Sequence, residues 1–228
     1  MKKIFKYSII IGLLSIISFS IYLFKDLERW HESDKQIKGI DISHYQTVTD
    51  WGAVSDQVDF VIIKATEGAT WKDAKFNKYW QKSKRHNIIR GAYHFFSPNV
   101  SAEQQFNNFK NSVTLSKGDL PPFLDVEDKS IDMTEVNKWL QLAEDHYGVK
   151  PIVYSDFMFY KIFMNFSVED YPLWLYTNEN YYFKPDFDQP KCLFWQYSQI
   201  GKLKGIKDIV DLDGFLGDKK SFDNFLIH

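Results

Sequence analysis

The sequence contains a single cysteine, Cys192, so no disulfide can form within the chain. The folded protein must therefore be held together by packing. Cys192 lies in an apolar run with only Lys191 as a nearby cation. We interpret it as a small buried hydrophobic residue, because a reactive thiolate needs stronger activation than this.

The sequence also lacks an excess of either charge, with 28 Lys and Arg against 30 Asp and Glu and a net charge of −2. No basic cluster interleaved with aromatic residues is large enough to hold a phosphate backbone, which excludes nucleic acid as the expected partner. Aromatic residues are plentiful and make up 18% of the 228 residues, whereas the hydrophobic content of 44% is ordinary. This composition predicts one domain with a sizeable core, and either that core or a binding surface is rich in rings.

The N-terminus differs from the rest of the chain. Basic residues Lys2, Lys3 and Lys6 precede an uncharged apolar stretch, 7–24, that is near the minimum for crossing about 30 Å of hydrocarbon. No small-x-small cleavage site follows, so we favour an uncleaved signal anchor over a removed signal peptide. The basic flank would stay in the cytoplasm and place the remainder outside.

These features predict three segments and a location. Residues 1–24 are a cytoplasmic stub with a signal-anchor or transmembrane segment, residues 25–37 a linker, and residues 38–228 the folded domain. The predicted location is membrane-anchored with an extracytoplasmic domain, in the periplasm or at the cell surface, or secreted if the anchor is cleaved.

Eight strand-like apolar runs recur after the linker: 39–43, 60–66, 89–96, 122–127, 152–155, 173–176, 193–197 and 209–213. Helical patterns separate the early runs, at 75–86, after Ser101 and after Asp132, the last two with capping-box spacing to Gln104 and Glu135. No helical period separates the last three runs. This order predicts an α/β fold, a TIM-like barrel of about five βα units followed by three strands.

Two carboxylates, Asp125 and Glu127, end an apolar run that contains no basic residue. In a strand, residues two apart share a face, about 6 to 7 Å from each other. One of the two would then keep its proton above its ordinary pKa of about 4 and could donate it to a leaving group. The alternative is a structural pair, capped by backbone N–H groups or bridged to a distant lysine.

Further polar residues fall at or near other predicted strand ends, where a barrel gathers its functional groups. A pocket of carboxylates walled by rings fits a neutral, hydroxyl-rich substrate better than a phosphate. The acids are Asp41, Glu67, Asp211 and Asp213, and their companions are Tyr93, His94, Tyr154, Trp174 and Gln196.

Six short blocks in order resemble family 25 of the glycoside hydrolases, the N-acetylmuramidase lysozymes. They are Gly-Ile-Asp-Ile-Ser-His at 39–44, Lys-Ala-Thr-Glu-Gly at 64–68, Gly-Ala-Tyr-His-Phe at 91–95, Leu-Asp-Val-Glu at 124–127, Trp-Gln-Tyr at 195–197 and Val-Asp-Leu-Asp at 210–213. Each block alone is weak, but together they cover the chain from about residue 38 onward. The resemblance implies a (β/α)5(β)3 barrel that cleaves the β-1,4 bond after N-acetylmuramic acid in peptidoglycan.

The resemblance also implies roles for the acids. Glu127 would be the general acid, with Asp41, Asp125 and Asp211 as the other acidic members of the site. Two mechanisms stay open: Asp211 or Asp41 activates water and inverts the anomeric centre, or the substrate's own acetamide attacks while Asp125 orients it. We favour the second, because residues two apart on one strand suit an acid and an acetamide holder.

The remaining matched residues have two possible roles each. Tyr93, Tyr154 and Trp174 would be walls of the substrate site or aromatic core residues. Gln196 would bind sugar or Asp211, and Glu67 would contact substrate or hold neighbouring strand ends.

A metal role for His44 and His94 is disfavoured, because the resemblance implies no metal or cofactor. Tyr176 and the 45–47 segment depart from the family pattern, which leaves the outer subsites open. Expected partners are peptidoglycan glycan strands and the membrane, with the protein a monomer.

Two other functions compete with hydrolysis. One is a non-catalytic module that binds cell-wall glycan on the same fold, against which the retention of all four matched acids argues. The other is a metal-dependent phosphodiesterase, which would need basic phosphate ligands that these strand ends lack.

Overall fold

The structure is a computed structural model that describes residues 37–164, 167–177 and 191–228, and residues 37–228 form one compact unit. The predicted N-terminal segment, 1–24, and all of the predicted linker except Ile37 lie outside the described residues. The predicted segment boundaries therefore stay predictions.

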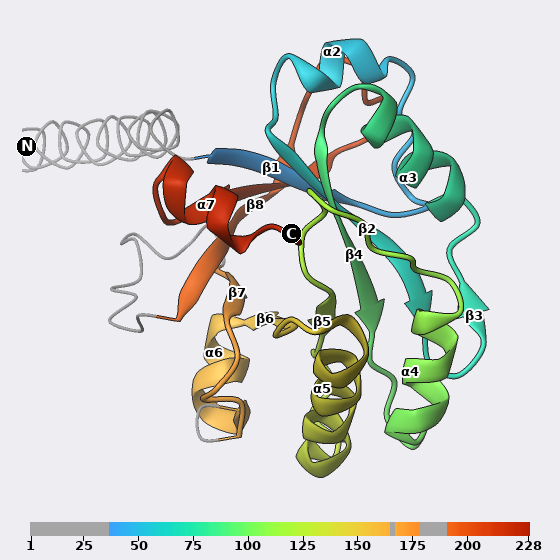
Figure 1. The fold of residues 1–228 in the computed structure, drawn as a ribbon. Coiled ribbons are helices and arrows are strands. Elements are labelled where there is room, and N and C mark those ends of the chain that lie inside the picture. Colours follow the sequence, from blue (N-terminus) through green and yellow to red (C-terminus); the bar gives the residue numbers. More distant parts are fainter. Residues whose placement is uncertain (1–36, 165–166, 178–190) are drawn as a thin grey trace, which may run out of the picture. The chain divides into compact units, whose positions relative to one another are not determined.

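Eight strands form a closed barrel, because β1, which begins the sheet order and pairs with β9, also pairs with β2 near the other end of that order (Figure 1). A two-residue strand, β3 (Trp71–Lys72), adds to the edge of β2. The barrel strands are β1 (Ile37–Ile42), β2 (Phe60–Glu67), β4 (Ile89–Phe95), β5 (Phe123–Asp125), β6 (Ile152–Asp156), β7 (Leu173–Tyr176), β8 (Cys192–Gly201) and β9 (Val210–Phe215). The predicted TIM-like barrel is confirmed.

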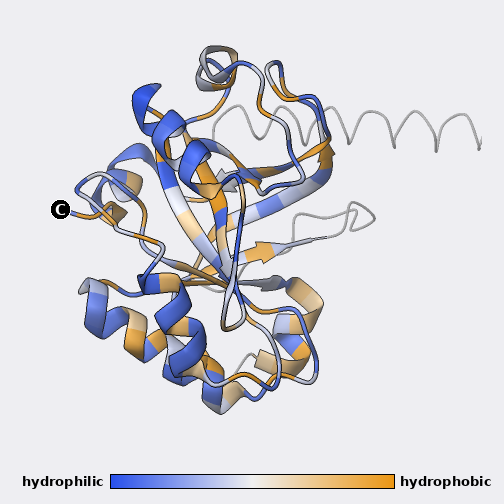
Figure 2. Cartoon of the chain, turned by 90° about the vertical axis from the view of Figure 1, so that its right-hand side faces the viewer, coloured by the Kyte–Doolittle hydropathy of each residue, from blue (hydrophilic) through white to orange (hydrophobic). Residues whose placement is uncertain are grey.

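Helices follow the first five barrel strands, as predicted, and lie around the barrel (Figure 1). They are α2 (Trp51–Ser55), α3 (Phe76–Arg85), α4 (Ala102–Lys110), α5 (Met133–Tyr147) and the short α6 (Phe157–Phe159), which continues into a π-helix, η2 (Tyr160–Met164). A terminal helix, α7 (Lys219–Phe225), follows β9. Apolar and polar residues alternate around the helices in Figure 2, as expected for elements that cover a barrel on one face.

Two helices begin where the sequence predicts. The Ser101 side chain accepts a hydrogen bond from the Gln104 N–H at the start of α4, and Asp132 caps α5 through the N–H of Thr134. The Glu135 carboxylate departs from the capping-box geometry, because it accepts from the backbone N–H of Ala102 at the start of α4. It therefore joins the starts of two neighbouring helices.

Several phenylalanine rings pack together in one buried cluster. Phe60, Phe123, Phe194 and Phe215 belong to one buried cluster, with edge-to-face contacts of 5.2 to 5.6 Å between centroids. Two glycines make room for these rings: a Cβ at Gly39 would lie 2.2 Å from Phe60, and one at Gly91 would lie 2.6 Å from Phe123. The aromatic excess of the sequence therefore serves the core first.

The predicted membrane-anchored location is contradicted. In the part of the chain that the structure describes, no helix is long and apolar enough to cross a membrane. The longest of those helices, α5, has 15 residues and buries one apolar face against the barrel, whereas a span needs about 20 mainly apolar residues. The apolar stretch on which the prediction rested, 7–24, lies outside the described residues.

Candidate active site

The predicted acids meet at one end of the barrel. Asp41 lies near the end of β1 and Asp125 is the last residue of β5. Asp211 lies at the beginning of β9, which runs antiparallel to β1, and it is the register partner of Asp41. The reversal of β9 therefore brings the start of this strand to the edge where the parallel strands end.

A chain of hydrogen bonds crosses the barrel beneath these acids. The Tyr154 hydroxyl on β6 donates to Oε1 of Gln196 on β8 at 2.8 Å, and Nε2 of Gln196 donates to Oδ2 of Asp41 on β1 at 2.6 Å. All three side chains are buried. The sequence left two possible partners for Gln196, sugar or Asp211, and the structure shows a third, Asp41.

Trp174 lies deeper than a wall of a substrate site. Its side chain is 2% exposed and packs against the rings of Phe123 and Tyr154. The indole N–H donates to Oδ1 of Asp213 at 2.8 Å. The structure therefore gives Trp174 the alternative role, a core aromatic, and one that orients a buried carboxylate.

Three carboxylates crowd together where β1 meets β9. Burial raises the pKa of Asp41, and the charges of Asp211 and Asp213 raise it further. Burial and the charge of Glu127 raise the pKa of Asp211 to about 6. Burial is also the main cause of the raised pKa of Asp213. At least one proton is therefore held in this group under conditions where isolated carboxyls have lost theirs.

Asp125 and Glu127 have different surroundings, contrary to the prediction of one strand face. The strand β5 ends at Asp125, which is buried, whereas Glu127 lies beyond it and is exposed on one side. Burial raises the pKa of both carboxyls, and the charge of Glu127 adds to the effect on Asp125. A hydrogen bond with Tyr154 acts in the opposite direction on Glu127.

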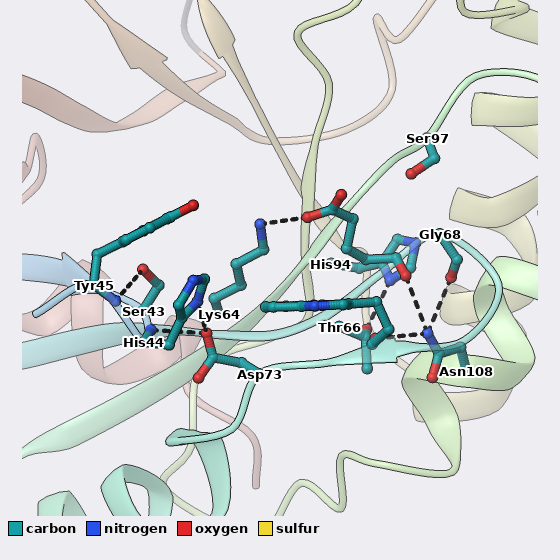
Figure 3. Close-up of polar contacts among 12 residues, drawn as sticks. Ser43, His44, Tyr45, Lys64, Thr66, Gly68, Asp73, His94, Ser97 and Asn108 are labelled. Carbon is teal, nitrogen blue, oxygen red and sulfur yellow. Dashed lines mark hydrogen bonds and ion pairs between the residues drawn. The ribbon is translucent and has the colours of Figure 1, made fainter.

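One cation, Lys64 on β2, reaches this group, although the run around Asp125 contains no basic residue. Its charge lowers the pKa of Asp125 and of Glu127 against the effect of burial. The Lys64 ammonium (Figure 3) forms an ion pair of 2.7 Å with Glu67. It lies 5.0 Å from the Trp71 ring and 4.6 Å from the Phe95 ring. Sequence reasoning missed Lys64, because the residue lies far from Asp125 along the chain.

The turn between β2 and β3 is held by one buried side chain, Asn108 of α4. Its amide nitrogen lies within hydrogen-bond distance of the carbonyls of Glu67, Gly68 and Trp71 (Figure 3). Beside this turn, Asp73 accepts from both the backbone N–H and the ring Nδ1 of His44 at 2.8 Å. The region therefore presents the exposed rings of Tyr45 and Trp71 on a fixed framework, and sequence reasoning did not single out Trp71.

The two histidines considered as metal ligands have other partners. His94 is fully buried between Thr66 and Gln105, and burial lowers its pKa to about 3, so the ring is neutral. His44 is engaged by Asp73. Among the described residues, no group of three or more His, Cys, Asp or Glu side chains is placed to hold a metal ion.

A cavity of about 460 Å³ opens beside Glu127. Tyr154 and Tyr176 contribute to its lining from the barrel, and residues of α6 and η2 form its outer wall. The predicted site is therefore continuous with a hollow large enough for part of a substrate.

The comparisons with known proteins agree with this geometry. The model of "Glycosyl hydrolases family 25" matches residues 40–206. The chain belongs to this family. It is a glycoside hydrolase with the family's barrel, and the family supports peptidoglycan muramidase activity.

Three relatives show how close this likeness is. The chain is 38% identical to "Uncharacterized protein YegX" of Escherichia coli (strain K12) over 83% of its length and 73% of that protein. It is 34% identical to "Autolytic lysozyme" of Clostridium acetobutylicum over 78% of its length, which spans 56% of that protein. The structure of a family 25 glycosyl hydrolase from Bacillus anthracis superimposes with a TM-score of 0.77 at 31% identity, over 85% of this chain and 95% of that one.

Proposed function

We propose that this family 25 hydrolase is an N-acetylmuramidase that cleaves the β-1,4 bond between N-acetylmuramic acid and N-acetylglucosamine in peptidoglycan. The observation that carries the proposal is the position of Glu127, accessible from a cavity and backed by Asp125 and Asp211. Within this proposal the substrate is the glycan strand, and the enzyme acts as a monomer whose domain spans residues 38–228.

Glu127 is the general acid. Its raised pKa keeps a proton on the carboxyl, and its open side allows that proton to reach a glycosidic oxygen in the cavity. Tyr154 lines the cavity beside this carboxyl. The leaving sugar would depart as an alcohol once the oxygen has taken the proton.

Asp125 orients the substrate's acetamide group. Among the described residues, no group donates a hydrogen bond to its buried Oδ1, so this oxygen can accept from an acetamide N–H. The acetamide oxygen then attacks the anomeric carbon as the glycosidic bond breaks. Water, deprotonated by the Glu127 carboxylate, opens the resulting ring with net retention of configuration.

The inverting mechanism uses Asp211 in place of the acetamide. The Asp41 carboxylate already accepts from Gln196, so Asp211 is the better candidate for a base that activates water. This mechanism predicts the opposite anomer in the first product. An NMR spectrum of the product recorded before mutarotation separates the two, and an inverted configuration would reject substrate assistance.

The central test compares Glu127→Gln and Asp125→Asn with wild type on purified peptidoglycan, with identification of the new reducing-end sugar. We expect a fall in kcat of about a hundredfold or more for Glu127→Gln, the usual scale for losing a general acid. Asp128→Asn is the matched control, because this neighbouring carboxylate is exposed and, within the described part of the chain, its side chain hydrogen-bonds to Ser130 alone. Unchanged turnover by Glu127→Gln would remove it from this role.

The second candidate, a glycan-binding module, makes a different prediction. Wild type would then bind peptidoglycan without releasing reducing sugar, and Glu127→Gln would bind equally well. The raised pKa of Glu127 favours hydrolysis, since a binding module gains nothing from a proton poised above a cavity.

A further inference from the structure

The cavity beside Glu127 has an unusual outer wall. It is formed by α6 and by η2, a π-helix, which is a rare element that occurs often at functional sites. Met158, Ile162 and Phe163 line the cavity and are 42%, 65% and 44% exposed. Three exposed apolar side chains on so short a segment form a surface that favours an apolar contact.

The polar lining residues Glu127, Tyr154 and Tyr176 come from the barrel side of this cavity, whereas the side chains that α6 and η2 contribute are apolar. Asp156 already accepts from the backbone N–H groups of Met158 and Phe159, at 2.8 and 3.0 Å, where it caps α6. Gln199 lines another part of the wall. A sugar ring needs a partner for each of several hydroxyl groups, so this wall suits it poorly. A chain with alkyl side groups suits it better.

Lys129 is the one cation among the lining residues. Its ammonium lies 5.9 Å from the centroid of the Phe163 ring, which itself packs against Phe159 at 5.0 Å. Lys129 is exposed, and no ion-pair partner is found for it among the described residues. The wall therefore combines an apolar face with the ammonium of Lys129, although the carboxyls of Glu127 and Asp156 also line the cavity. A ligand that is partly alkyl and places a carboxylate against Lys129 fits this wall.

The substrate assigned above carries such a group next to the bond that is cleaved. Muramic acid bears a lactyl ether whose carboxyl group is extended by a short peptide with alkyl side chains and free carboxylates. We propose that the cavity formed by Lys129, Met158, Ile162 and Phe163 binds this stem peptide, so that the enzyme recognises the peptide together with the sugar chain. The inference rests on the proposed function and adds the part of the substrate that this wall contacts.

Kinetics on two matched substrates test the proposal with the full chain. One is intact peptidoglycan, and the other is the same glycan strands after an amidase has removed the stem peptides. We expect wild type to have the higher kcat/KM on the intact polymer. Phe163→Ser and Lys129→Glu should each lower that value by up to about tenfold, the factor that corresponds to about 1.4 kcal/mol, and leave the value on stem-free strands unchanged.

Matched controls separate the cavity from general surface effects. Lys129→Arg keeps the charge and should keep most of the preference for intact polymer. Lys84→Glu on α3 makes the same charge change away from the cavity, and Ile209→Ser removes another exposed apolar side chain, 53% exposed. These two variants should behave as wild type on both substrates.

Several results would overturn the proposal. Equal kcat/KM of wild type on the two substrates would do so, as would an equal loss on both in the cavity variants. A failure of the proposed function looks different, because neither substrate would then release reducing sugar and Glu127→Gln would change nothing.

A binding measurement gives an answer that does not depend on turnover. In NMR spectra of the full chain, the δ1-methyl signal of Ile162 should shift on titration with N-acetylmuramyl-L-alanyl-D-isoglutamine. It should stay in place with N-acetylmuramic acid alone. An equal shift with both would make the cavity a sugar site and contradict the inference.

Discussion

The two sides of the candidate site differ in how they are built. In the strand order of the barrel, β1 and β2 lie across from β6 and β7. On the side of β1 to β3, Asn108, Asp73 and Glu67 hold the turn and its neighbours through buried or half-buried hydrogen bonds (Figure 3). On the side of β6, a short helix and a π-helix present apolar side chains, with Asp156 as their cap.

This difference supports the proposal that the barrel contacts two chemically different parts of its substrate. The first side offers fixed polar groups and the ring faces of Tyr45 and Trp71, which are 74% and 39% exposed. Such surfaces suit sugars. The second offers an alkyl wall and one cation. The acidic centre between them serves both, so changes on either side should alter recognition without abolishing the chemistry.

The largest stability effect should come from the framework of the first side. We expect Asn108→Ala to lower the free energy of unfolding by about 1 to 3 kcal/mol, because three carbonyls lose a shared donor. Asp156→Ala on the second side should lower it by about 1 kcal/mol, the typical cost of a lost helix cap.

Urea unfolding followed by circular dichroism measures both losses. Asn107→Ala is the matched control for Asn108→Ala, since Asn107 is the exposed neighbour on α4. If Asp156→Ala cost as much as Asn108→Ala, the contrast in rigidity between the two sides would be refuted.

The next effect concerns sugar recognition. Trp71→Ala should lower kcat/KM on stem-free glycan strands about 2- to 10-fold, the range expected for a lost aromatic contact of about 0.5 to 1.5 kcal/mol. Phe163→Ala should leave that value unchanged, because in the proposed recognition Phe163 contacts the stem peptide, which these strands lack. Steady-state release of reducing sugar measures this. A loss with Phe163→Ala as large as that with Trp71→Ala would erase the distinction.

A shift in pH dependence should follow from Lys64→Met. Four charged groups interact with Glu127. They are Lys64 of β2, Asp156 of β6, Asp125 of β5 and Asp211 of β9. Lys64 lowers the pKa of both Glu127 and Asp125, so its removal raises both. The profile of kcat/KM against pH has one limb that reports ionisation of Asp125 and one that reports loss of the Glu127 proton. Both limbs should move to higher pH.

Profiles of kcat/KM against pH for Lys64→Met and for Lys72→Met test this shift. Lys72 is exposed on β3, so its substitution should leave the profile in place. A profile of Lys64→Met that stays in place or moves to lower pH would contradict the effect assigned to the Lys64 charge.

The last prediction concerns the pH dependence of stability and Asp211, at the centre that both sides share. The pKa of this carboxyl is about 6 in the folded protein against an ordinary 3.8. The folded state therefore keeps a proton that the unfolded state releases, and this contribution to stability is lost as pH rises from about 4 to 6. The Tm of Asp211→Asn minus the Tm of wild type should therefore be larger at pH 7 than at pH 4. A variant less stable at pH 7 would show a stabilising role for this charge.

The sequence predicted strands more accurately than short helices. The run 173–176 coincides with β7, and 89–96 exceeds β4 by one residue. Buried strands are apolar runs between turn residues, which a local pattern records. No comparable signal marked α2, α6 or η2, because a helix of one turn has too few residues to show a period.

The sequence was less informative about the surroundings of the acids. It indicated that Asp125 and Glu127 share a strand face, but β5 ends between them and gives one a buried and the other an exposed position. It considered a distant lysine only as a structural bridge. Lys64 instead bonds to Glu67, and its charge acts on the pair from β2.

The sequence by itself determined the family, the order of strands and helices, and which carboxylates are candidates for chemistry, because these depend on residue identity and short-range spacing. Only the tertiary structure decided which groups meet: the reversal of β9, the arrival of Lys64 and the apolar wall beside Glu127. Closing a sheet into a barrel brings side chains from distant segments into one desolvated space. Their pKa values and partners are therefore properties of that space and of no single segment.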